Sequence, residues 1–219
     1  MTTNILCFGD SLTWGWVPVA EAVPTTRYAP DVRWTGVLAA ELGEDYHVIE
    51  EGLSARTTSA DDPTDPRLNG STYLPSALAS HLPLDLVIIM LGTNDTKSFL
   101  HRTPADIATG MSLLAGQVGA SAGGVGTGYP APKLLIMSPP PLAEKMGHPW
   151  FDVIFDAESV EKSKQLAGLY RSLADFMKCE FFEAGSVIST DGVDGIHWTE
   201  QNNADLGKAL AEKVRSVLG

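Results

Sequence analysis

Five short apolar runs, each followed by a turn-rich stretch, alternate along the chain with segments of helical periodicity. The runs are residues 5–8, 47–49, 86–91, 134–137 and 181–182, and the helical segments are residues 35–42, 74–82, 107–118, 160–177 and 204–218. The runs are apolar at successive positions, which is typical of strands covered on both faces. The sequence therefore predicts an α/β fold, a three-layer α/β/α sandwich around a five-stranded parallel sheet.

The length and composition are those of one folded domain. The 219 residues are 44% hydrophobic, and a chain of this size buries about 70% of its surface on folding, enough for one large core. We therefore expect residues 1–219 to form a single domain. The chain carries 15 basic and 27 acidic residues, a net charge of −12. Nucleic acid and anionic membrane surfaces are not expected as partners, because both repel an acidic protein.

The cysteines and the apolar runs indicate a cytoplasmic protein. Cys7 and Cys179 both lie in apolar runs, where a free thiol behaves as a small apolar side chain. The longest apolar run, residues 86–91, is far shorter than the roughly 20 residues of a membrane helix. No basic segment precedes an apolar one at the N-terminus, so no signal peptide is expected.

Three connections are longer than usual: residues 15–31, 59–73 and 139–155. In open parallel sheets the binding site lies beyond the carboxyl ends of the strands, where several loops meet. The third connection carries Trp150 and Phe151. We interpret such loops as walls of a pocket, as a subunit interface, or as ordinary irregular surface.

A serine stands directly after the first predicted strand. The segment Gly9-Asp10-Ser11-Leu12-Thr13 places Ser11 at a strand-to-helix turn, where a hydroxyl is exposed and backbone N–H groups face an anion. A serine at such a turn is either a nucleophile or the cap of the following helix.

An aspartate and a histidine stand close together before the last predicted helix, in Asp194-Gly195-Ile196-His197. The three-residue spacing lets the carboxylate accept the Nδ1–H of the imidazole, which leaves Nε2 free to take a proton from a serine. Such pairs also occur in helix caps and solvated turns. Their position at the same sheet edge as Ser11 favours the catalytic interpretation.

Two further loops offer hydrogen-bond donors for an oxyanion. The third predicted strand ends in Gly92-Thr93-Asn94-Asp95, whose asparagine amide is one candidate donor. The second is followed by a tight loop, residues 52–56, with a backbone N–H from Gly52 or Ala55 as the other. Each loop taken alone is also explained as a polar turn.

These four segments, in this order, resemble the successive blocks of the SGNH (GDSL) hydrolase family. The segments 5–16, 50–58 and 191–197 are similar to its bacterial arylesterase/acyltransferase branch, the mycobacterial perhydrolase type, over nearly the whole chain. The resemblance implies a flavodoxin-like sandwich, the SGNH hydrolase fold. It also implies a serine esterase acting on small carboxylic esters, with acyl transfer to alcohols or peroxide.

The resemblance assigns roles to individual residues. It implies Ser11 as nucleophile, His197 as general base and then acid, and Asp194 as the residue that orients the histidine. The implied oxyanion hole consists of the Ser11 N–H, the Ala55 N–H and the Asn94 amide. Much of the family has glycine where this chain has Ala55, and alanine resists a positive φ. The residues expected to contact the substrate flank these groups: Leu12, Trp16, Thr93 and Ile196.

Other functions stay open at this stage. Within the family these are carbohydrate acetylesterase, thioesterase and lysophospholipase. A different class is a non-catalytic flavodoxin-like binder of a phosphate or nucleotide at the first turn, although Asp10 would repel the phosphate. The expected chemistry needs no cofactor, and the acidic cluster of Asp61, Asp62 and Asp65 lacks the ligand spacing of a calcium loop. The resemblance also suggests a homo-oligomer, with an octamer as one candidate.

Overall fold

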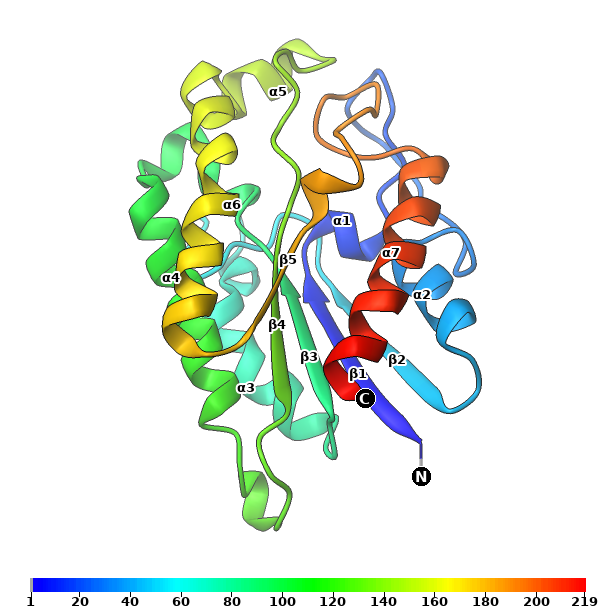
Figure 1. The fold of residues 1–219 in the computed structure, drawn as a ribbon. Coiled ribbons are helices and arrows are strands. Elements are labelled where there is room, and N and C mark those ends of the chain that lie inside the picture. The colour runs from blue at the N-terminus through cyan, green and yellow to red at the C-terminus, as the bar shows by residue number, and fades with distance from the viewer. Residues whose placement is uncertain (1) are drawn as a thin grey trace.

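The computed structural model describes residues 2–219, which form a five-stranded, entirely parallel sheet with helices on both faces (Figure 1). The strand order is β2-β1-β3-β4-β5. The strands are β1 (Thr3–Gly9), β2 (Tyr46–Gly52), β3 (Leu86–Met90), β4 (Lys133–Ser138) and β5 (Glu180–Glu183). The predicted α/β/α sandwich is therefore confirmed, and each predicted strand lies within an observed one or overlaps it.

The longer helices cover the two faces of the sheet. Helices α2 and α7 pack against each other on one face, and α3, α4 and α6 cover the other (Figure 1). The α-helices are α1 (Ser11–Trp14), α2 (Trp34–Leu42), α3 (Gly70–Ser80), α4 (Pro104–Gly119), α5 (Pro149–Ile154), α6 (Ala157–Met177) and α7 (Glu200–Leu218). Within residues 2–219, five single-turn 3₁₀ helices occur in the connections: η1 (Pro66–Leu68), η2 (Asn94–Thr96), η3 (Ser98–Leu100), η4 (Gly124–Gly126) and η5 (Ala184–Ser186).

Successive residues of the central strands feed two separate cores. In β1, Ile5 and Cys7 pack beneath α2 and α7, whereas Leu6 and Phe8 pack beneath α3, α4 and α6. All four side chains are buried, because neighbouring residues of a strand point to opposite faces and both faces carry helices. Burial on both sides is the physical reason why these runs are continuously apolar.

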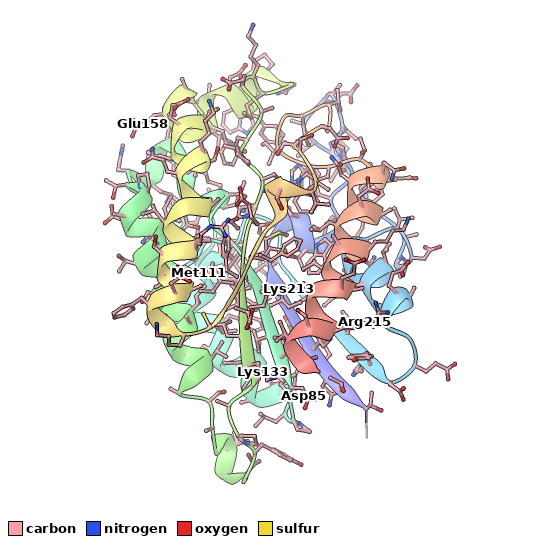
Figure 2. All side chains as sticks on the ribbon, in the orientation of Figure 1. Asp85, Met111, Lys133, Glu158, Lys213 and Arg215 are labelled. Atoms are coloured by element: carbon pink, nitrogen blue, oxygen red, sulfur yellow. The ribbon has the colours of Figure 1, made fainter. Side chains whose placement is uncertain are left out.

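Polar side chains lie outside these cores. Glu158 of α6 and Arg215 of α7 are exposed, whereas Met111 of α4 is fully buried; Figure 2 labels these side chains. Along residues 2–219, no helix has both the length and the hydrophobicity that crossing a membrane requires.

The connections at the carboxyl ends of the strands differ in part from the sequence expectation. The long connection 139–155 contains α5, which begins at Pro149 and is capped by His148 Nδ1, the acceptor of the Trp150 N–H at 3.1 Å. Proline at the first helical position and a capping side chain before it are ordinary helix-start signals. A helix of six residues shows too little periodicity to be recognised from apolar spacing.

Candidate active site

Three polar side chains from opposite ends of the chain meet above the carboxyl end of β1. Ser11 Oγ lies 2.9 Å from His197 Nε2, and His197 Nδ1 lies 2.7 Å from Asp194 Oδ2. Ser11 is the first residue of α1, and the other two lie on the loop before α7. All three residues are buried. The geometry is a row of hydrogen bonds from hydroxyl to imidazole to carboxylate.

The Asp194 side chain is hydrogen-bonded to the backbone of the loop that connects it to His197. Asp194 Oδ1 accepts the N–H groups of Ile196 at 3.0 Å and His197 at 2.9 Å, so the carboxylate is fixed by the loop that it serves. Gly195 has φ +78°, and a Cβ there would stand 2.6 Å from the Lys145 carbonyl oxygen. Only glycine fits this turn without displacing backbone.

The carboxylate determines which imidazole nitrogen carries the proton. Burial raises the pKa of Asp194, but the hydrogen bonds from His197 and the loop N–H groups outweigh it and hold the pKa below its ordinary value. An ionised carboxylate accepts only, so Nδ1 of His197 carries the hydrogen and Nε2 presents its lone pair to the Ser11 hydroxyl. The hydroxyl therefore donates to Nε2.

The ring of Trp16 stacks on the ring of His197, with centroids 5.0 Å apart and an interplanar angle of 14°. Trp16 follows α1 closely, so the segment that carries the serine also covers the histidine. Its indole Nε1 is buried, and among the described residues it has no hydrogen-bond acceptor. The stack restricts rotation of the imidazole and forms one wall of the cavity above Ser11.

Candidate oxyanion donors line the same cavity. The cavity is lined by Ser11, Ala55 and Asn94, among others. Within the hydrogen-bond network of residues 2–219, the backbone N–H groups of Ser11 and Ala55 have no acceptor. The Asn94 amide donates one hydrogen to Asp10 Oδ2 at 3.1 Å, which leaves its second hydrogen for a ligand. Gly52 lies beneath Trp14 instead, outside the cavity.

Ala55 adopts a backbone conformation that alanine disfavours. Its φ is +71°, and it is the third residue of a turn in which the Arg56 N–H donates to the Leu53 carbonyl at 3.1 Å. Glycine is the usual residue with positive φ at this position of a turn. The chain therefore keeps the glycine-like backbone while carrying a Cβ.

Asp10 connects the serine turn to the asparagine. Its Oδ1 accepts the Leu12 N–H at 2.9 Å, and its Oδ2 accepts the Asn94 amide. Burial raises the pKa of Asp10 to about 7, and the hydrogen bond from Leu12, the nearby Arg56 guanidinium and the Asn94 amide offset part of that rise. Burial therefore destabilises the negative charge of Asp10, the carboxyl group that orients Asn94, at neutral pH.

The cavity above Ser11 has a volume of about 170 Å³. Trp16 and Ile196, both expected to contact substrate, line it. The remaining lining residues, which the sequence did not single out as contacts, are Ser54, Lys97, Phe151, Ile154 and Phe155. Three of them belong to α5 or the residue after it, in the long connection interpreted as a pocket wall or interface.

Leu12 and Thr93 lie elsewhere. Leu12 is buried in the core beneath α2 and α7, and neither residue lines the cavity described above. The reason is local: Leu12 follows Ser11 on α1, so its side chain leaves the helix in a different direction. Thr93 is buried and precedes η2.

A second cavity, of about 540 Å³, adjoins the first and shares Lys97 and Ile154 with it. Exposed aromatic side chains, Phe99 and Trp150, lie along it. Lys97 is paired with Asp62 at 2.8 Å, and both are buried. The ion pair neutralises the lysine that faces both cavities.

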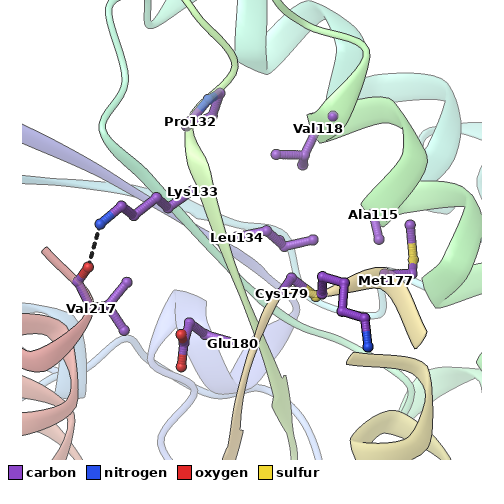
Figure 3. A pocket seen from close by; sticks show the side chains of 11 residues that line it. Ala115, Val118, Pro132, Lys133, Leu134, Met177, Cys179, Glu180 and Val217 are labelled. Atoms are coloured by element: carbon purple, nitrogen blue, oxygen red, sulfur yellow. Dashed lines mark hydrogen bonds between the residues drawn. The ribbon is translucent and has the colours of Figure 1, made fainter. Parts of the chain in front are cut away.

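A further cavity, of about 420 Å³, lies at the opposite end of the sheet (Figure 3). It is lined by Lys133 and Glu180, the first residues of β4 and β5, together with Leu134 and Cys179. Its described lining contains neither serine nor histidine, so the polar row and this cavity are at opposite ends of the strands.

The acidic residues after the second strand are paired with side chains of the same chain. Asp61 accepts the Asn69 amide, Asp62 pairs with Lys97, and Asp65 pairs with Arg67. Within the described part of the chain, no group of three or more histidine, cysteine or acidic side chains is arranged to hold a metal ion.

Solved structures of other proteins are similar to this chain over its whole length. An aryl esterase from M. smegmatis, solved with an inhibitor bound, shares 70% sequence identity with this chain, covers 99% of it and 100% of its own length, and superposes with a TM-score of 0.97. A carbohydrate acetylesterase from Sinorhizobium meliloti shares 66% identity with the same coverage and TM-score. No curated protein matched the sequence.

The sequence profile of one protein family matches residues 7–204, which include all three residues of the polar row and the candidate oxyanion donors. The match spans most of the chain, and both similar structures superpose over their full length. The chain therefore belongs to the GDSL-like lipase/acylhydrolase family.

Proposed function

We propose that this protein is a serine esterase that cleaves small carboxylic esters through an acyl-serine intermediate. The observation that carries the proposal is the hydrogen-bonded row of Ser11, His197 and Asp194 beside unpartnered donors in one cavity. A serine held as a helix cap alone would not need an imidazole acceptor at hydrogen-bond distance from its hydroxyl.

In the first step Ser11 Oγ attacks the ester carbonyl carbon while His197 Nε2 takes the hydroxyl proton. The carbonyl oxygen gains negative charge and is held by the N–H groups of Ser11 and Ala55 and by the Asn94 amide. The imidazolium is stabilised by the Asp194 carboxylate. Collapse of the tetrahedral intermediate breaks the bond to the alkoxy oxygen, which takes the proton from Nε2 and leaves as alcohol.

The second step repeats the first with a new nucleophile. Water attacks the acyl-serine carbonyl, His197 takes its proton, and the Ser11 oxygen leaves and recovers that proton from Nε2. An alcohol or peroxide that enters in place of water gives an ester or a peracid by the same proton movements. We include this acyl transfer in the proposal, and the apolar walls formed by Trp16, Phe151 and Ile154 support it.

The cavity dimensions favour a small acyl group. The space above Ser11 is about 170 Å³ and mostly apolar, which suits an acetyl-type group better than a lipid chain. The adjoining space of about 540 Å³, with Phe99 and Trp150, has room for the alcohol part of the ester. The names of the two similar structures, an aryl esterase and a carbohydrate acetylesterase, support aryl and sugar acetates as the alternatives to compare in a substrate panel.

Further proposals concern the whole molecule. We propose that residues 1–219 are one SGNH hydrolase domain, supported by the single sheet and by the family match over residues 7–204. We propose a cytoplasmic location, supported by two free cysteines, of which Cys7 is buried and Cys179 half-buried. We propose a homo-oligomer, with an octamer as the first size to test, supported by the exposed apolar side chains of Trp150 and Val153 beside the cavity mouth.

Replacing the nucleophile tests the reaction directly. Ser11→Ala should remove ester hydrolysis and labelling by a fluorophosphonate, because only an activated serine reacts with that probe. Asn94→Ala should fold and lower kcat by about 10²–10³-fold, the usual effect of losing one oxyanion donor. Turnover of 4-nitrophenyl acetate measures both. Wild-type-like turnover in Ser11→Ala, or an unlabelled wild-type protein that retains a phosphate ligand, would favour the binding-protein alternative.

Replacing Asp10 by asparagine tests its buried charge. Between pH 4 and pH 7 the folded wild type keeps a proton on Asp10 that the unfolded chain releases, so its free energy of unfolding falls as pH rises. The asparagine side chain does not titrate. The free energy of unfolding of Asp10→Asn, relative to that of the wild type, should therefore increase by up to about 4 kcal/mol from pH 4 to pH 8. Urea unfolding at several pH values measures it. Parallel stability curves for the two proteins would contradict the assignment.

Asp10→Asn should also lower kcat, because the Asn94 amide loses the carboxylate that orients it, with a ceiling of about 10³-fold. Steady-state kinetics on the same preparations gives the comparison.

Removing Trp16 tests the proposed acyl transfer. Trp16→Ala opens the apolar wall beside His197, so water should reach the acyl-serine more easily and the ratio of transfer to hydrolysis should fall several-fold. Product analysis in mixtures of water and a primary alcohol measures this ratio. An unchanged ratio would remove Trp16 from the part of the site that selects the acceptor.

The oligomeric state has a simple measurement. Light scattering of the purified protein should give a mass that is a multiple of 23.3 kDa, and Trp150→Glu should lower it, because a charge replaces an apolar side chain at the proposed contact. A wild-type mass of one chain would overturn the oligomer proposal while leaving the esterase proposal intact.

A further inference from the structure

Arg56 is a buried cation directly after Ala55. The residue is only 2% exposed, and among the described residues no carboxylate lies within ion-pair distance of it. Burial lowers its pKa to about 10, so the guanidinium stays charged at neutral pH. A buried charge without an ion pair is costly to a fold, which indicates that its contacts serve a purpose.

Its contacts are backbone carbonyls at the ends of two strands. Arg56 Nη1 donates to the Gly9 carbonyl at 2.8 Å and also to the Glu51 carbonyl. The guanidinium carbon lies 4.2 Å from the centre of the Phe8 ring, a cation–π contact that partly replaces water around the charge. The side chain thereby bridges the carboxyl ends of β1 and β2.

The same carbonyl anchors the other end of the Ala55 turn. The Leu53 N–H donates to the Gly9 carbonyl at 3.1 Å, and the Arg56 N–H closes the turn on the Leu53 carbonyl. The turn is therefore tied to Gly9 at its first and last residues. Gly9 is two residues before Ser11, so this carbonyl connects the loop of one oxyanion donor to the turn of the nucleophile.

The turn needs such an anchor because of its alanine. A left-handed conformation is unfavourable for any residue with a Cβ, and Ala55 has φ +71°. Without an external constraint, the turn would relax toward negative φ, and the Ala55 N–H would change direction. A glycine at the same position would carry no such penalty.

We propose that Arg56 is a positioning residue that locks the Ala55 N–H into the oxyanion hole by fastening its turn to the Gly9 carbonyl. The inference rests on the proposed function, in which Ala55 is an oxyanion donor. Arg56 does not touch the substrate: it acts through the backbone of Ala55. Loss of the guanidinium should affect the transition state, in which the oxyanion is formed, more than the binding of the ester.

The first experiment compares two replacements of Arg56 under conditions where each protein is folded by circular dichroism. Arg56→Met should lower kcat by about 10²-fold, similar to the loss of one donor, with KM within about threefold of wild type. Arg56→Lys should retain more activity, because an ammonium still donates to one of the two carbonyls. Leu210→Ala is the control: Leu210 is fully buried in α7, and its truncation destabilises the fold without touching either turn.

The second experiment separates positioning from general support of the fold. Ala55→Gly should raise the kcat of Arg56→Met at least about tenfold, and this gain should exceed the effect of the same replacement in the wild type, because glycine takes the positive φ without an anchor. If Arg56→Met does not fold, the same cycle is run on Arg56→Lys. Equal effects of Ala55→Gly with and without the guanidinium would overturn the proposal.

Fluorophosphonate labelling distinguishes failure of the esterase proposal from failure of the positioning role of Arg56. If wild-type Ser11 is not labelled, the proposed esterase function fails. If wild type is labelled and Arg56→Met is labelled at the same rate with unchanged kcat, the esterase function stands and the positioning role of Arg56 is wrong. Slow labelling of Arg56→Met, restored by Ala55→Gly, supports both.

Discussion

The parallel register of β1 between its two neighbours is the constraint on which the site depends. Gly9, the last residue of β1, pairs with Gly52 of β2 and with Met90 of β3. Three strands therefore end at one level, and the loops that follow them deliver a hydroxyl, a backbone N–H and an amide to one place. A shift of one residue in any pair would reverse which face each side chain occupies.

Much of this arrangement was predictable because strand burial and motif spacing are local properties. The five strands, the parallel sandwich and the loops that carry Ser11, Asn94 and His197 followed from apolar runs and turns. The cavity walls in α5 did not, because Phe151 and Ile154 reach the site through a long irregular connection. Its path depends on packing against distant segments, which leaves no periodic signal in the sequence.

The pKa shifts at the site could not be predicted from the sequence, because they depend on which groups are neighbours in the folded structure. Nothing in the sequence around Asp10 and Arg56 indicates that their pKa values are shifted. The shifts arise because both side chains are buried and lie close enough to interact electrostatically. The positive φ of Ala55 is a related case: its resemblance to a glycine position pointed to a strained turn, and only the surrounding hydrogen bonds explain how the turn is held. The cost of a polar group in a low-dielectric interior is decided by its neighbours in space rather than by its neighbours in sequence.

The two thiols differ in a way that has a practical consequence. Cys7 lies in the middle of β1 with no exposed surface, and burial raises its pKa far above the ordinary value. Cys179 is half-buried and lines the cavity at the amino ends of β4 and β5. Burial also raises the pKa of Cys179, but its partial exposure makes it the thiol that a maleimide dye should reach in the native protein. The dye would then stand at the opposite end of the sheet from Ser11, where it can report on tumbling without obstructing ester entry.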